Sequence, residues 1–147
     1  PTAEEKAAVE KYFTEHREKK FVVDTYGGRS IKKVQELRNE IERGRTAKHH
    51  VGTHKNNKLF VHEKIHEDKG VSILIPKEWH KDFVHGANKV QPENFRQALF
   101  TSIKEMRKLP DRMNASALRE EVRKDLNEAL LEALKKNKEV FPEQLKK

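Results

Sequence analysis

Apolar side chains recur every three to four positions along most of this chain, which predicts a mostly helical fold. Thr2 is a candidate N-cap for a helix that begins at residue 3, and Leu109-Pro110 ends the helix that begins at Pro92. The spacing predicts helices over residues 3–19, from Ser30 to about Gly44, over 77–84, from Pro92 to about Leu109, and a last long one capped by Asn114 or Ser116. Residues 58–68 favour a further short helix.

Three short segments carry the pattern of strands instead. Val71–Ile75 is the clearest, because the run Val-Ser-Ile-Leu-Ile is stopped by Pro76. Residues 21–23 form a short extended piece, and residues 46–51 form a short strand followed by a turn at Asn56-Asn57. We therefore expect an α+β, mostly helical fold with residues 1–147 in a single domain.

The net charge of the chain indicates the class of partner that it binds. The 147 residues carry a formal net charge of +8, and the isoelectric point is about 9.6. From Arg29 to Lys58 there are nine Lys and Arg against three Glu, so the excess is concentrated there. Such a balance favours a polyanionic partner, with nucleic acid first, an acidic protein second and an anionic membrane surface third. No apolar run is long enough to span a bilayer.

Two adjacent histidines, His49 and His50, lie inside this basic stretch. With no cysteine in the chain, any metal must be held by nitrogen or oxygen ligands. One imidazole can hold a divalent ion on a scissile phosphate while a neutral neighbour takes a proton from water. Successive strand side chains alternate, so the pair would point to opposite sides of its strand. A helix packed on that strand, carrying His80, could supply further ligands.

These segments resemble a known nuclease motif. His49-His50-Val51, the strand Val71–Ile75, and Pro76-Lys77-Glu78-Trp79-His80 followed by His85-Gly86 are similar to the ββα-metal motif, also called His-Me finger or HNH/endonuclease VII-like. It occurs in nuclease bacteriocins, polymorphic bacterial toxins and some phage endonucleases. The resemblance covers residues 46–90 and implies a small ββα-metal core there, flanked by helices in residues 1–45 and 91–147.

The resemblance also implies roles for individual residues. His50 would be the general base, His49 a metal ligand, and His80 and His85 would complete the metal site. In the family the two helix histidines are usually four residues apart, whereas here they are five apart, which on an ideal helix is a rotation of roughly 140°. The chain offers no secure counterpart of the family's central Asn, so the residue that orients the base is unassigned.

The function implied is hydrolysis of phosphodiester bonds by an endonuclease that needs a divalent ion (Mg, Mn, Zn or Ni), with DNA preferred to RNA. The family further implies the toxin domain of an interbacterial competition system, secreted or delivered into a target bacterial cell to act in its cytoplasm. A dedicated, often acidic immunity protein would neutralise it. The candidate contacts to substrate phosphates are Arg45, Lys48, His54, Lys55, Lys77 and Lys81.

Two other classes of function explain part of the same pattern. A non-catalytic helical domain that binds nucleic acid explains the charge and requires nothing of the histidines. A metal-independent ribonuclease would use His50 and another imidazole as base and acid on a 2′-hydroxyl. His62 and His66 are four residues apart, and we interpret them as an exposed polar helix face rather than a second metal site.

Overall fold

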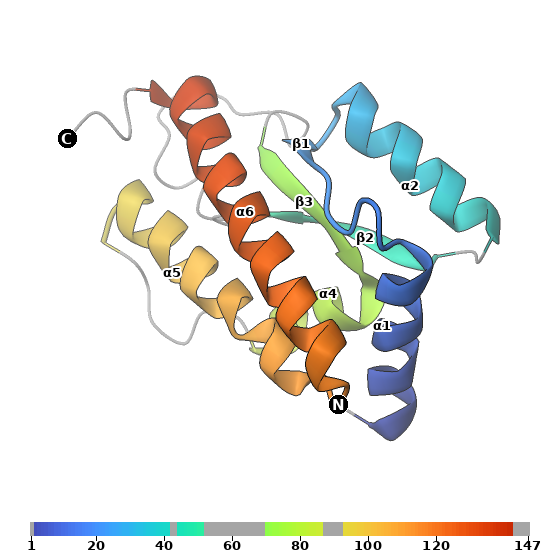
Figure 1. Ribbon diagram of the computed structural model, residues 1–147. Helices are drawn as coiled ribbons and strands as arrows, with labels where there is room; N and C mark the ends of the chain where they lie inside the picture. The colour runs from blue at the N-terminus through green and yellow to red at the C-terminus, as the bar shows by residue number, and fades with distance from the viewer. Residues whose placement is uncertain (1, 42–43, 52–69, 87–92, 143–147) are drawn as a thin grey trace.

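The computed structural model describes residues 2–41, 44–51, 70–86 and 93–142. It shows a mostly helical α+β fold built around one small antiparallel sheet (Figure 1). The elements are α1 (Ala3–Glu15), β1 (Val23–Thr25), α2 (Arg29–Ile41), β2 (Thr46–His50), β3 (Val71–Pro76), α4 (Lys77–Gly86), α5 (Phe95–Arg107), the 3₁₀ helix η2 (Leu109–Arg112) and α6 (Ser116–Val140). Within these ranges no helix combines the length and apolar character that crossing a bilayer requires.

The central strand of the sheet is β3, with β1 on one side and β2 on the other. All six residues of β3 are buried, because packed residues cover both faces of the sheet. Val71, Ile73 and Ile75 belong to the main core shared with α1, α5 and α6. On the other face Leu74 packs with Ile31 of α2. Figure 1 shows α6 running across the first of these faces.

The order β2, β3, α4 gives the hairpin-and-helix unit that the sequence predicts. β2 and β3 pair antiparallel, and α4 begins at Lys77, directly after the last residue of β3. The sheet extends beyond residues 46–90, however, because β1 pairs antiparallel with β3 from the N-terminal segment. The predicted helix at 58–68 and the turn at Asn56-Asn57 lie outside the residues that the structure describes.

The first helix ends four residues earlier than the pattern predicts. The N-cap prediction is confirmed, since Thr2 forms a capping box with Glu5. After the end of α1, side chains donate hydrogen bonds to backbone carbonyls that would accept from backbone amides in a longer helix. Lys20 donates to the carbonyl of Arg17, and Arg38 donates to the carbonyl of Lys19. The Lys20 ammonium also lies 2.7 Å from carboxylate oxygens of Glu121 and Asp125, which fastens this turn to α6.

Two other helix starts differ from prediction. Ser30 lies inside α2, which begins at Arg29. Helix α5 begins at Phe95 rather than Pro92, because the Asn94 side chain accepts a hydrogen bond from the backbone amide of Gln97. The buried stripe of α5 otherwise follows the predicted spacing.

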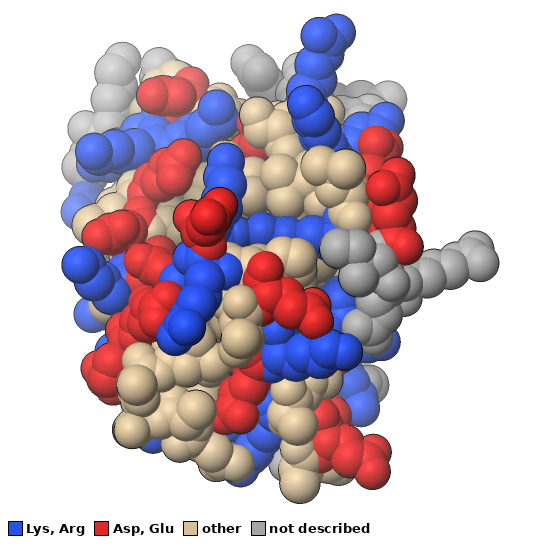
Figure 2. Space-filling view, turned by 45° about the vertical axis from the view of Figure 1, so that its right-hand side comes forward, with Lys and Arg blue, Asp and Glu red and all other residues tan. Residues whose placement is uncertain are grey.

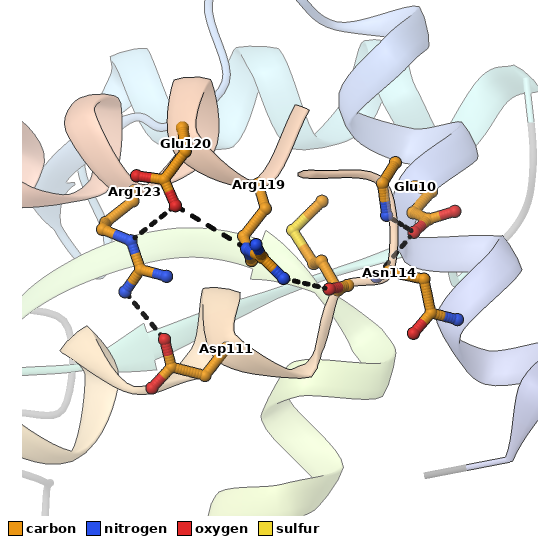
Figure 3. A network of polar contacts seen from close by, with 8 residues as sticks. Glu10, Asp111, Asn114, Arg119, Glu120 and Arg123 are labelled. Carbon is orange, nitrogen blue, oxygen red and sulfur yellow. Dashed lines mark hydrogen bonds and ion pairs between the residues drawn. The ribbon is translucent and has the colours of Figure 1, made fainter. Parts of the chain in front are cut away.

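The N-terminus of α6 is capped by another helix. The N-cap residue is Ala115, so the predicted capping by Asn114 or Ser116 is wrong. Instead, Glu10 of α1 accepts hydrogen bonds of 2.9 Å at Oε1 from the backbone amides of Asn114 and Ala115 (Figure 3). A carboxylate is favourable here, because amides without intrahelical partners and the positive end of the helix dipole meet at this point.

We expect Glu10→Ala to lower the free energy of unfolding by about 0.5–2 kcal/mol, the usual cost of a lost N-cap. Urea unfolding followed by circular dichroism measures this. Glu15→Ala is the matched control, because Glu15 lies on the same helix in an exposed pair with Lys11 at 3.9 Å, and exposed pairs contribute little. Equal losses in the two variants would contradict the capping role.

Candidate active site between β2 and α4

The pairing of β2 with β3 separates the two adjacent histidines. His49 lies opposite Ile73, and His50 lies opposite Ser72. Residues directly opposite each other in an antiparallel pair point to the same face of the sheet. His49 therefore points to the face of the main core, whereas His50 points to the face covered by α2.

His49 meets His80 at the junction of the strand with the helix. Their ring centres are 5.7 Å apart and the ring planes are inclined at 69°. Only 6% of His49 is exposed, and His80 is half-buried on the first turn of α4. These two imidazoles come from residues 31 positions apart, and the ββα unit brings them together.

Burial determines the protonation state of this pair. Loss of hydration is the largest cause that lowers the pKa of His49 to about 3, and the neighbouring His80 and His50 rings contribute in the same direction. Burial also lowers the pKa of His80. Both rings are therefore neutral near pH 7, and each has a ring nitrogen able to bind a cation or accept a proton.

The spacing of the two rings fits a shared metal ion. Two imidazoles bound tetrahedrally through Zn–N bonds of about 2.0–2.1 Å have ring centres roughly 5 Å apart. The separation of 5.7 Å is close to this value. Among the described residues no group of three or more His, Asp or Glu side chains gathers in this way. His49 and His80 are a pair of imidazoles whose separation would allow them to share one ion.

The structure does not bring His50 to the His49–His80 pair. The His50 ring stacks on Tyr26, with ring centres 4.6 Å apart and planes inclined by 7°. On the same face of the sheet, the Lys48 ammonium lies 3.9 Å from the centre of the Tyr26 ring and donates to the Tyr26 carbonyl at 2.8 Å. Two of the predicted site residues, His50 and Lys48, therefore pack against Tyr26 instead of facing His80.

Arg45, a predicted phosphate contact, lies inside the protein. It is 5% exposed, forms an ion pair with Glu78 and donates to the carbonyl of Ala8. Its guanidinium also lies 5.1 Å from the centre of the Tyr12 ring. Because its charge is balanced by Glu78 in a buried position, we do not assign Arg45 a role in binding substrate. No local sequence signal indicates this pair, since the two residues are 33 positions apart.

The remaining predicted site residues divide into two groups. Lys77 and Lys81 are exposed on α4, and Lys81 lies 4.0 Å from a carboxylate oxygen of Glu5. His54, Lys55 and the side chain of His85 lie outside the description of the structure. On the face shown in Figure 2, basic and acidic side chains are interspersed among the residues drawn in colour, so this face carries no continuous basic surface.

Comparison of the chain with family models, curated proteins and solved structures finds no match.

Proposed function

We propose that this chain is a metal-dependent endonuclease of the ββα-metal type, in which His49 and His80 are two of the metal ligands. One observation carries the proposal: a hairpin and the helix that follows it place a buried imidazole and a half-buried one with ring centres 5.7 Å apart. Neutral imidazoles on neighbouring elements are the usual nitrogen ligands of divalent ions.

The residues of the site would act in the following way. His49 and His80 offer ring nitrogens that are unprotonated at neutral pH, because burial has lowered both pKa values. When bound, a divalent ion supplies stabilisation of the charge that develops on the scissile phosphate and on the leaving oxygen. Lys77 and Lys81 are exposed one turn apart on α4, with Lys77 three residues before His80, and would contact phosphates on either side of the scissile one.

The net charge of +8 supports nucleic acid as the substrate. The preference for DNA over RNA, delivery into a bacterial cell as a toxin, and an acidic immunity partner are supported by the motif resemblance alone. We include them in the proposal on that basis.

The decisive experiment incubates plasmid DNA and tRNA with the purified protein in Mg²⁺, Mn²⁺, Zn²⁺, Ni²⁺ or EDTA. We expect cleavage that EDTA abolishes, and a loss of about 100-fold or more in His49→Ala and in His80→Ala. Metal affinity, measured by titration calorimetry, should fall in the same two variants. His16→Ala is the matched control, because His16 is a half-buried histidine packed on Tyr12 in α1.

His50→Ala separates the two roles of the tandem pair. Because His50 points to the other face of the sheet, its removal should leave metal affinity unchanged. A loss of cleavage at unchanged metal affinity would assign proton transfer to His50. Cleavage of RNA alone that persists in EDTA would replace the proposal by a metal-independent ribonuclease. Salt-sensitive binding without any cleavage would replace it by a non-catalytic binding domain.

A further inference from the structure

A basic cleft lies between the C-terminal end of α5 and the middle of α6. Its volume is about 280 Å³, and it is lined by Lys104, Arg107, Lys108, Arg123 and Asn127. Four of these five side chains are cationic and the fifth is an amide, so no acidic side chain lines the cleft among the described residues. Helices α5 and α6 run side by side in Figure 1, on the side of the sheet away from α2.

The cationic side chains of this cleft differ in whether a nearby carboxylate balances their charge. Arg123 is held by Asp111 at 2.7 Å and by Glu120 at 3.5 Å, which Figure 3 shows. Lys108 lies 3.8 Å from Glu105 in an exposed pair, which contributes little. Lys104 and Arg107 form no ion pair with any residue that the structure describes. The cleft therefore combines one fixed guanidinium with two cations whose charge is not balanced nearby.

Helix stability explains only part of this arrangement. Lys104 and Arg107 lie in the last turn of α5, where cations are favoured by the negative end of the helix dipole. That effect does not require cations on a second helix. Arg123 and Asn127 come from α6 and complete the lining from the opposite side. A cluster of donors from two helices is the arrangement that binds an anion.

An exposed aromatic ring lies on the side of α5 that carries Lys104 and Arg107. Phe100 is 45% exposed, and the Arg96 guanidinium lies 5.6 Å from the centre of its ring. With a rotation of about 100° per residue, Arg96, Phe100, Lys104 and Arg107 fall within a sector of roughly 80° of the helix. Cations that follow a phosphate backbone, together with an aromatic face that stacks bases, are the features with which proteins bind single-stranded nucleic acid.

We propose that this cleft binds the phosphate backbone of a nucleic-acid strand, and that Phe100 stacks on an unpaired base next to it. The choice of nucleic acid as the anion rests on the proposed function, whereas the anion site itself rests on the side chains of α5 and α6. The surface is formed by elements other than β2 and α4, so it can be tested separately from the His49–His80 pair.

The test compares two double variants that remove the same charge. Lys104→Gln/Arg107→Gln removes the two unbalanced cations, and Lys135→Gln/Lys138→Gln removes two exposed lysines of α6 outside the cleft. Binding of a short labelled DNA single strand is followed by fluorescence anisotropy in EDTA over a range of salt concentrations. We expect the cleft variant to bind about tenfold more weakly. The negative slope of log K against the logarithm of salt concentration should become less steep by about 1.4, because two phosphate contacts are lost. Equal shifts in the two double variants would overturn the proposal.

Phe100→Ala tests the stacking part. We expect it to weaken binding of a single strand about fivefold or more and to leave duplex binding unchanged, since paired bases cannot reach the ring. Equal weakening on both substrates would exclude stacking. If inorganic phosphate raises the melting temperature of the wild type but not of the cleft variant, while both bind DNA equally, the nucleic-acid assignment is wrong.

A small phosphodiester, bis(p-nitrophenyl) phosphate, separates this inference from the proposed function. The cleft variant should hydrolyse it at the wild-type rate, because the small substrate does not need the cleft. Loss of DNA affinity in the cleft variant without any nuclease activity in the wild type would refute the proposed function alone. Confirmed nuclease activity with equal DNA binding in the two double variants would refute the cleft alone.

Discussion

Glu78→Met is expected to lower the free energy of unfolding by about 3–5 kcal/mol, because it removes the Glu78 carboxylate from a buried guanidinium. Arg45 and Glu78 are 5% and 9% exposed, so water cannot replace the lost carboxylate. The ion pair also links the two elements of the candidate site. Arg45 precedes β2 and Glu78 lies in the first turn of α4, and the amide of Lys77 donates to the carbonyl of Arg45 at 3.0 Å.

Urea unfolding of two further variants identifies the cause of this loss. Arg45→Met/Glu78→Met removes both charges and should be less destabilised than Glu78→Met alone, since no buried charge is left unbalanced. Glu105→Gln breaks the exposed pair with Lys108 and should change the stability by no more than about 0.5 kcal/mol. A Glu78→Met variant as stable as Glu105→Gln would show that the buried pair does not hold β2 to α4.

Acid is expected to weaken the fold through His49. Its pKa is about 3 in the folded protein and about 6.5 when exposed, so unfolding allows the ring to take up a proton. The stability due to this group is fully present above about pH 6.5 and is lost as the pH falls toward 3. From pH 7 to about pH 4.5 the loss from His49 alone should be about 2–3 kcal/mol.

The measurement is urea unfolding at both pH values for the wild type and for His49→Asn, whose side chain does not titrate. The wild type should lose about 2–3 kcal/mol more than the variant on acidification. His16→Asn serves for comparison, because burial lowers the pKa of His16 in the same direction at a less buried position. The same pH dependence in the wild type and in His49→Asn would mean that the His49 ring is not desolvated.

The elements that depend on local pattern were predictable from the sequence. The strand at 71–75 is confirmed as β3, because its apolar run is bounded by a glycine and a proline. The apolar residues of α6 recur every four positions, and Leu118, Val122, Leu126 and Leu130 are all buried, while Leu134 is partly buried. In α6 the period of the apolar residues defines the buried face, whereas β3 is a short, nearly continuous apolar run that is buried on both faces.

Features that depend on distant partners could not be predicted. The pairing of β1 with β3 joins segments almost fifty residues apart, and nothing in a three-residue strand specifies its neighbour. The cap that Glu10 provides for α6 joins residues 104 and 105 positions apart. Local rules assign capping to Asn114 or Ser116, and they cannot anticipate a carboxylate that the packing of α1 brings there.

The candidate site was predictable only in part. Strand alternation predicted that His49 and His50 point to opposite faces, and the register with β3 confirms this. The contact of His49 with His80 agrees with the predicted packing of a helix on the strand. The stacking of His50 on Tyr26 was not predictable, because Tyr26 reaches this face only through the fold of β1 on β3.

The alternation of the tandem histidines makes the site dependent on strand alignment. If β2 slipped by one residue against β3, every side chain of β2 would change faces, so His50 would be delivered to His80 and His49 to Tyr26. The slipped hairpin would form a new set of backbone hydrogen bonds and would exchange a buried neutral ring for its neighbour. Arg45, anchored through both its carbonyl and its guanidinium to the start of α4, opposes such a slip and so preserves which of two identical rings enters the site.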